Sequence, residues 1–148
     1  LRGEGVEADD EKAIRWLEKA AKAGLPAAQT LLANLYSAGR GVPRDDEAAA
    51  EWYRKAANLG DPKGQVALAI MLHTGRGVEV DDVEAAMWLA LAEKSEYEGA
   101  GEKLAVLEDL LDETQRSEAH ARAEQWKPTK PKRSQQPDAP QLGAGGMY

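Results

Sequence analysis

The sequence predicts an all-α fold, a right-handed α–α superhelix built from repeated helix–turn–helix units. A glycine pair followed by valine recurs every 36 residues, at 3–6, 39–42 and 75–78. Tryptophan keeps the same register, at Trp16, Trp52 and Trp88. Within each copy, apolar residues follow the 3.6-residue period of a helix. A fixed period of this length is the sequence signature of a helical solenoid.

The first helix of each unit has start and stop signals. An acidic residue precedes each of these helices, at Asp9, Asp45 and Asp81. We expect these side chains to cap the helices, because a short acceptor satisfies an N–H of the first turn. Glu84 lies three residues after Asp81, a spacing that fits a capping box. Gly24 and Gly60 are expected to end the first two of these helices.

The second helices are marked in the same way. Pro26 and Pro62 suit a first helical position, where the missing N–H is not needed. Asp61 is the expected cap before Pro62. Gly39 and Gly75 are expected to end these helices, and the Gly-x-Gly-Val segment then links one unit to the next.

Residue size along the helices indicates how the units pack. Alanines allow close helix contact, and larger side chains are expected to fill the space between layers: Trp16, Leu31, Leu32, Leu35 and Tyr36. One hairpin cannot bury its apolar face alone, so stability is expected to come from stacking. Trp52→Ala should then cost about 3–5 kcal/mol and cause cooperative loss of the array.

The third unit departs from the pattern, since Glu96, Tyr97 and Glu98 replace the Gly-Asp-Pro of residues 60–62. A second helix is still predicted from about Ala100 to Leu111, through Leu104, Val106, Leu107 and Leu110. A closing helix follows, with Asp112 and Gln115 as a capping box. We therefore divide the chain into an array over 1–126 (units of about 3–38, 39–74 and 75–111, closing helix 112–126) and a disordered tail over 127–148.

Composition excludes several classes of function. The chain has 148 residues and a net charge of −7, and the basic tail leaves 1–126 at −10. This acidity argues against nucleic acid as a partner, and no apolar run is long enough for membrane insertion. Cysteine is absent, which excludes thiol chemistry. The start at Leu1 leads us to expect a fragment or processed chain.

The middle unit resembles the Sel-1-like repeat (SLR) family, relatives of the tetratricopeptide solenoids. The matching pattern is Gly39-x-Gly41-Val42-x-x-Asp45, then Ala49-x-x-Trp52-Tyr53-x-Lys55-Ala56-Ala57-x-x-Gly60, then Gln65-x-x-Leu68. The resemblance implies an adaptor or scaffold that binds a protein or peptide. We also expect the protein to be monomeric and, because no catalytic constellation is present, not to be an enzyme. The resemblance also favours a bacterial periplasmic or secreted location over the cytoplasm. The alternative is a non-catalytic repeat arm of a larger bacterial envelope protein or enzyme.

The expected binding surface is the side of the first helices that points away from their partners, the concave face of such solenoids. In the first two units this face is charged: Lys12, Arg15, Lys19, Glu51, Arg54 and Lys55. The third unit has an apolar stripe there: Val83, Met87, Ala90 and Leu91. Two interpretations stay open, because the closing helix could cover Met87 and Leu91, or they could form a hydrophobic groove for the partner.

No catalytic, cofactor or metal site is predicted. His73 and His120, the two histidines, lie in different predicted helices without cysteine or converging carboxylates at ligand spacing. We expect them to have surface or packing roles. The glycine pairs resemble anion-binding loops individually, but their repetition favours a connector role.

Overall fold

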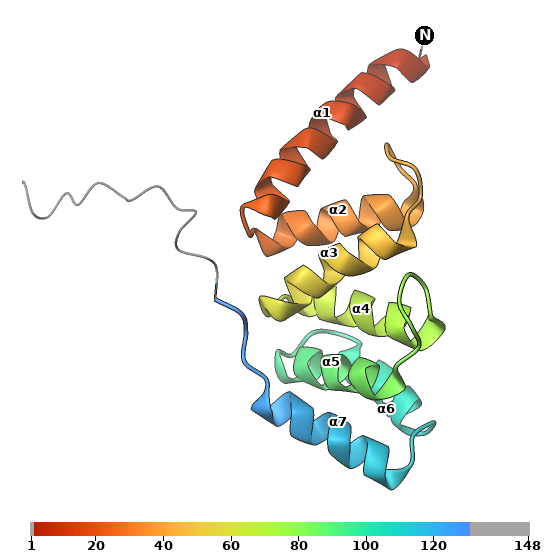
Figure 1. Cartoon of the computed structure of the whole chain (residues 1–148), viewed down its shortest axis with the longest axis vertical. Coiled ribbons are helices and arrows are strands. Elements are labelled where there is room, and N and C mark those ends of the chain that lie inside the picture. Colours follow the sequence, from red (N-terminus) through yellow and green to blue (C-terminus); the bar gives the residue numbers. More distant parts are fainter. Residues whose placement is uncertain (1, 131–148) are drawn as a thin grey trace, which may run out of the picture.

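The computed structural model describes residues 2–130, with side chains described from Asp10 onward. It confirms the predicted all-α solenoid (Figure 1). The helices of this region are α1 (Arg2–Lys22), α2 (Pro26–Ala38), α3 (Asp46–Asn58), α4 (Pro62–Thr74), α5 (Asp82–Lys94), α6 (Ala100–Glu108) and α7 (Glu113–Gln125). Most of the tail predicted to be disordered, 131–148, lies outside the described residues.

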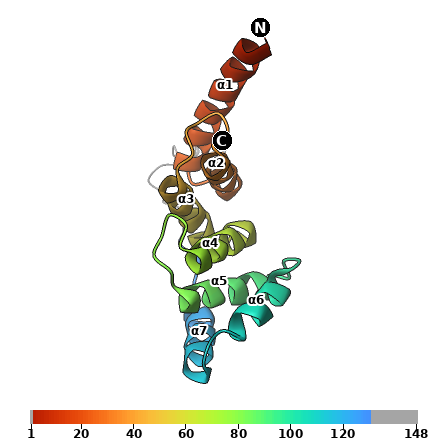
Figure 2. The ribbon, with the colours of Figure 1, turned by 90° about the vertical axis from the view of Figure 1, so that its right-hand side faces the viewer.

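The helices form a stack in which each of α1 to α5 packs against the next helix along the chain. Turned by 90°, the array shows α3 and α7 on one side and α4 and α6 on the other (Figure 2). The last helix breaks this order, because α7 packs on α5 and has little contact with α6. α7 therefore covers one side of α5, the first helix of the third hairpin.

Most of the predicted helix boundaries are confirmed. Asp45 and Asp81 cap α3 and α5, accepting from the N–H of Ala48 at 3.0 Å and of Glu84 at 2.9 Å. Asp112 and Gln115 form the expected capping box on α7. The capping box at Asp81 was wrong, because the carboxylate of Glu84 instead accepts hydrogen bonds from Arg54 and Trp88.

The first helix differs from its counterparts. α1 begins at Arg2, so Asp9 lies inside the helix and does not cap it. In the later units the linker is held by the preceding helix: the N–H of Asp45 donates to Tyr36, and that of Asp81 to Leu72. No preceding helix in the described residues can hold 3–6 in this way, so this segment continues the helical hydrogen bonding.

The turn between the two helices of a hairpin keeps its hydrogen bonds in the third unit, although its sequence differs there. Gly60 has φ +96°, its N–H donates to Ala57, and the N–H of Asp61 donates to Ala56. The third unit repeats both hydrogen bonds with Glu96 in place of glycine, at φ +60°. A side chain is strained in this left-handed region. Packing of α5 against α6 therefore imposes a turn that the local sequence disfavours.

The core is rich in alanine and leucine. Leu32 and Leu68 are fully buried at equivalent positions of α2 and α4. Two buried glutamines hold these helices to their partners, because Gln29 Nε2 donates to Ala21 O at 3.0 Å and Gln65 Nε2 to Ala57 O at 3.3 Å. The predicted core position of Leu31 was wrong, since this side chain is exposed on the outer side of α2.

Candidate partner-binding surface

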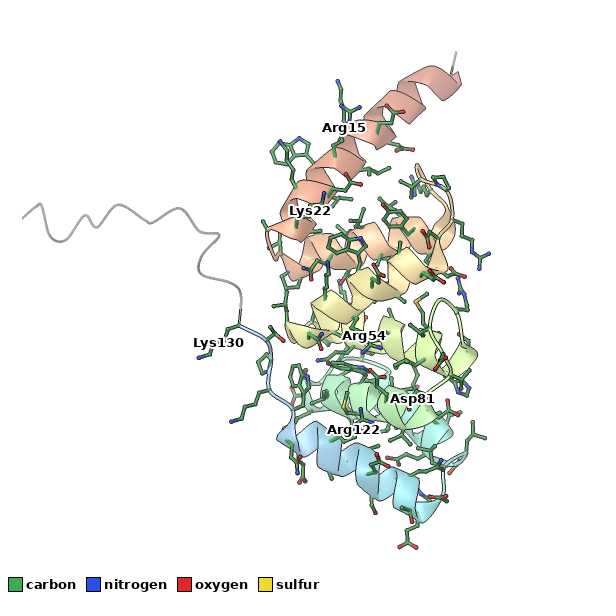
Figure 3. All side chains as sticks on the ribbon, viewed as in Figure 1. Arg15, Lys22, Arg54, Asp81, Arg122 and Lys130 are labelled. Carbon is green, nitrogen blue, oxygen red and sulfur yellow. The ribbon has the colours of Figure 1, made fainter. Side chains whose placement is uncertain are left out.

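The predicted charged surface lies on α1 and α3. Its members Lys12, Arg15, Lys19, Glu51 and Lys55 are all exposed. Arg54 is different, because its guanidinium lies 2.5 Å from Glu84 Oε1 and joins α3 to α5. Figure 3 shows Arg15 and Lys22 along α1, with Arg54 and Arg122 further down the array. Arg54 is thus held within the fold, whereas the other charged residues remain accessible.

The apolar stripe of the third unit is not available to a partner. Met87 and Leu91 are each 6% exposed and belong to the same apolar cluster as Ala119 and Ala123 of α7. α7 packs along α5 and covers this side of it. The interpretation of Met87 and Leu91 as a hydrophobic partner groove is therefore wrong, because the closing helix buries what a further repeat would have buried.

The end of α7 is fixed by an aromatic pair. The Trp126 ring meets the Trp88 ring edge to face, with centroids 5.9 Å apart and planes at 75°. The chain then runs back along the array, and the N–H of Thr129 donates to Asn58 O at 2.7 Å. Residues 127–130, predicted to be disordered, therefore lie against the α3–α4 hairpin, and Figure 3 shows Lys130 beside it.

The three repeated tryptophans differ in exposure. Trp88 is 2% exposed, whereas Trp52 is partly buried with the Lys55 ammonium 4.4 Å from its ring centroid. Trp16 is 77% exposed, so its predicted burial was wrong. Ala49 of α3 is fully buried against the preceding hairpin, but its counterpart Ala13 is exposed. Trp52 packs against the apolar cluster of the preceding α1–α2 hairpin, and Trp88 packs against Trp126 after α7, whereas Trp16 has neither kind of neighbour within 2–130.

The exposed indole lies in a shallow hollow with cations around it. Lys12, Arg15, Trp16 and Lys19 line a hollow of about 310 Å³ on the surface of α1. Three residues of the predicted binding surface thus gather around one aromatic ring. The prediction from sequence missed Trp16 as a surface residue.

A second hollow lies between α4 and α6. It has a volume of about 330 Å³ and is lined largely by apolar side chains, including the exposed Ile70, Val106 and Leu110. The sequence analysis did not predict this surface, because Val106 and Leu110 appeared to continue the apolar face of the helix. The structure instead leaves Val106 of α6 and Leu110, in the turn after α6, exposed beside this hollow.

The histidines hold helices together at the surface. His73 Nδ1 lies 2.8 Å from Asp82 Oδ1, and His120 Nε2 lies 2.6 Å from Glu108 Oε1. Each therefore has one carboxylate neighbour from another helix. Among the residues with described side chains, no three histidine or carboxylate groups gather as a metal site would require. Likewise, none of the helices within 2–130 is long and apolar enough to cross a membrane.

Two ionisable side chains, Asp46 and Tyr53, have shifted pKa values. Hydrogen bonds from Arg44 and Arg76 lower the pKa of Asp46 at the start of α3. Burial raises the pKa of the Tyr53 phenol, which donates a hydrogen bond to Asn34. Tyr53 joins α3 to α2 of the preceding hairpin, whereas Asp46 joins the start of α3 to the linkers on either side of its hairpin. Neither is placed for acid–base chemistry, which requires a cleft in which a substrate could bind.

Stacked helical hairpins with an open, charged face define a helical repeat protein of the solenoid class. A family model described as Sel1 repeat matches residues 1–25, 26–61 and 62–96. The chain belongs to the Sel1 repeat family. Proteins of this family generally mediate protein–protein interactions, and the fold is typically a non-catalytic scaffold.

Solved structures agree with this assignment. The chain is 36% identical to a protective antigen of uropathogenic Escherichia coli strains that displays an SLR fold, with a TM-score of 0.75 over 78% of this chain and 25% of that one. It is 40% identical to a Sel1 repeat protein from Oxalobacter formigenes, with a TM-score of 0.61 over 63% of this chain and 27% of that one. The chain thus spans about a quarter of the length of these structures. No curated protein matches it.

Proposed function

We propose that this protein is a monomeric scaffold that binds a protein or peptide on the concave face formed by α1 and α3. One observation carries the proposal: α7 covers this face over α5, while the equivalent positions on α1 and α3 remain exposed. The face holds Lys12, Arg15 and Lys19 on α1, with Glu51 and Lys55 on α3. A partner lying there would continue along the array from the position of α7.

The physical basis is a rigid surface that already has its bound shape. α3 packs against both α2 and α4, and α1 packs against α2, so the backbone of the face is already in place and a partner need not order it to bind. Exposed charges contribute mainly to the association rate and to the choice of partner. Contacts with Trp16 and Trp52 would supply apolar area, since aromatic side chains dominate the binding energy of many interfaces.

The test is an affinity capture with the intact chain and two matched charge-reversal variants. Arg15→Glu with Lys19→Glu changes the proposed face, and Lys94→Glu with Lys103→Glu makes the same change in charge elsewhere. We expect the first variant to lose partners that the wild type and the second variant retain. Arg54 is unsuitable for reversal because it would place a second carboxylate against Glu84. Equal loss in both variants would refute the proposed face.

The alternative is a non-catalytic repeat arm of a larger bacterial envelope protein or enzyme. The observation that favours it is the uncovered side of α1, where Ala13 and Trp16 are exposed although their counterparts in α3 and α5 are buried or partly buried. Sequencing the complete reading frame tests this alternative. A frame that encodes a further repeat before α1 would support the arm, and one that begins at α1 would exclude a preceding hairpin.

A further inference from the structure

The exposed side of α1 has a basic stripe. Lys12, Arg15, Lys19 and Lys22 are all exposed and follow one another at i, i+3, i+7 and i+10, which places them on one side of the helix. Among the described side chains these cations form one ion pair, in which Arg15 Nη2 lies 4.0 Å from Glu11 Oε2. Both partners of that pair are well exposed, so it competes weakly with other anions.

The stripe surrounds an aromatic ring that water contacts. Trp16 is 77% exposed and lies with three of the four cations around one hollow. An isolated exposed apolar residue is common on protein surfaces, but an indole is large enough to contribute most of the apolar contact of a small interface. The combination offers two kinds of contact, electrostatic attraction to anions and apolar area.

The third unit indicates what shape of ligand fits this position. Arg15, Trp16 and Lys19 lie 72 residues before Met87, Trp88 and Leu91, so the two sets occupy the same places in the repeat. On α5 that place holds a helix, α7, and the Trp126 ring contacts the Trp88 ring. On α1 the indole is retained, while cations replace its apolar neighbours. An occupant of α1 would therefore keep a side chain for the indole and replace apolar neighbours with carboxylates.

We propose that α1 binds an acidic helical segment of a partner protein, which places an apolar side chain on Trp16 and carboxylates beside Lys12, Arg15 and Lys19. This inference rests on the proposed function and specifies the chemistry of the partner. Charge distinguishes it from self-association, because residues 1–126 carry a net charge of −10 and two copies repel each other overall. A basic stripe on an acidic domain instead steers an acidic segment to one place.

The test uses the intact chain and two dye-labelled helical peptides of 13 residues, the length of α7. Both peptides have leucine at every fourth position. The residues between are alanine and glutamate in one peptide, and alanine and glutamine in the other. Fluorescence anisotropy gives the affinity. We expect the glutamate peptide to bind at least about tenfold more tightly than the glutamine peptide at low salt, and the difference to shrink as salt screens the charges.

Variants locate the contact. The double variant Arg15→Glu with Lys19→Glu should bind the glutamate peptide at least about tenfold more weakly, because two attractions become repulsions. Trp16→Ala should lower the affinity for both peptides by about tenfold, since it removes the apolar contact. Lys94→Glu with Lys103→Glu, which has the same net charge as the first variant, should bind like the wild type. Circular dichroism checks that every variant remains helical.

Several outcomes would overturn the inference: equal affinity for the two peptides, no binding of the glutamate peptide, or an unchanged affinity in the Arg15 and Lys19 variant. Dimerisation of the wild type through Trp16, seen by sedimentation and lost in Trp16→Ala, would identify a second copy as the occupant instead. If the peptides fail while affinity capture still depends on Arg15 and Lys19, the proposed function stands and the acidic partner is excluded.

Discussion

Truncating the three repeated tryptophans to alanine should produce a graded loss of stability that follows their burial. Trp88 is 2% exposed, packs edge to face on Trp126 and donates to Glu84 at 3.2 Å. Replacing it leaves a cavity and removes both contacts, at a cost of about 3–5 kcal/mol. Trp16 has a surface of roughly 200 Å² and buries about a quarter of it. At about 25 cal/mol per Å², replacing it with alanine should cost about 1 kcal/mol.

The partly buried Trp52 should fall between these two values. This refines the expectation from sequence, in which all three rings were buried alike. Urea unfolding followed by circular dichroism at 222 nm measures the helical content without relying on the fluorescence of the residue that is changed. We expect the transition midpoints to rank wild type, Trp16→Ala, Trp52→Ala and Trp88→Ala in descending order.

The ranking could fail in two informative ways. If Trp16→Ala were as unstable as Trp88→Ala, the indole of Trp16 would have to be covered in solution, and the binding surface on α1 would not exist as described. If Trp88→Ala were as stable as the wild type, stacking of α7 on α5 would contribute little. Either result would contradict the packing from which the exposed face of α1 is inferred.

Further predictions concern the stability effects of backbone substitutions and of the titration of Tyr53. Gly77→Ala should destabilise the array far more than Gly24→Ala when both are measured by thermal unfolding, because a Cβ on Gly77 would overlap the carbonyl of Asp46 whereas the space beside Gly24 is open. Glu96→Gly should raise stability by about 1 kcal/mol, since glycine adopts the left-handed turn without strain. Burial raises the pKa of Tyr53, so its contribution is complete below about pH 10 and is lost as pH rises through the folded-state pKa. Tyr53→Phe should remove that part of the alkaline loss in unfolding measured against pH.

The repeat itself could be predicted from the sequence because its signals are local. Asp45 and Asp81 cap their helices, and Pro62 begins α4, through hydrogen bonds and dihedral preferences that involve only neighbouring residues. The period of 36 residues then implies stacking, since an isolated hairpin cannot bury its apolar side. The closing helix was predictable for the same reason, through the capping box at Asp112.

The candidate site was predictable only in part. The sequence placed Lys12, Arg15 and Lys19 on one accessible side of a helix, because helical periodicity determines which residues share a face. It did not distinguish Arg54, whose position in the repeat resembles theirs but whose guanidinium is held by Glu84 from the next unit. Such a pairing joins residues 30 positions apart and depends on how two hairpins are oriented.

By itself, then, the sequence determined the helices, most of their boundaries and the repeat, since these follow from local hydrogen bonding and periodic hydrophobicity. Tertiary structure alone decided that α7 covers Met87 and Leu91 while Trp16 stays exposed. Identical residues in one register differ in burial because solvent exposure depends on which helix lies next to each of them. The direction in which α7 folds back is set by long-range packing on α5, which no local pattern encodes.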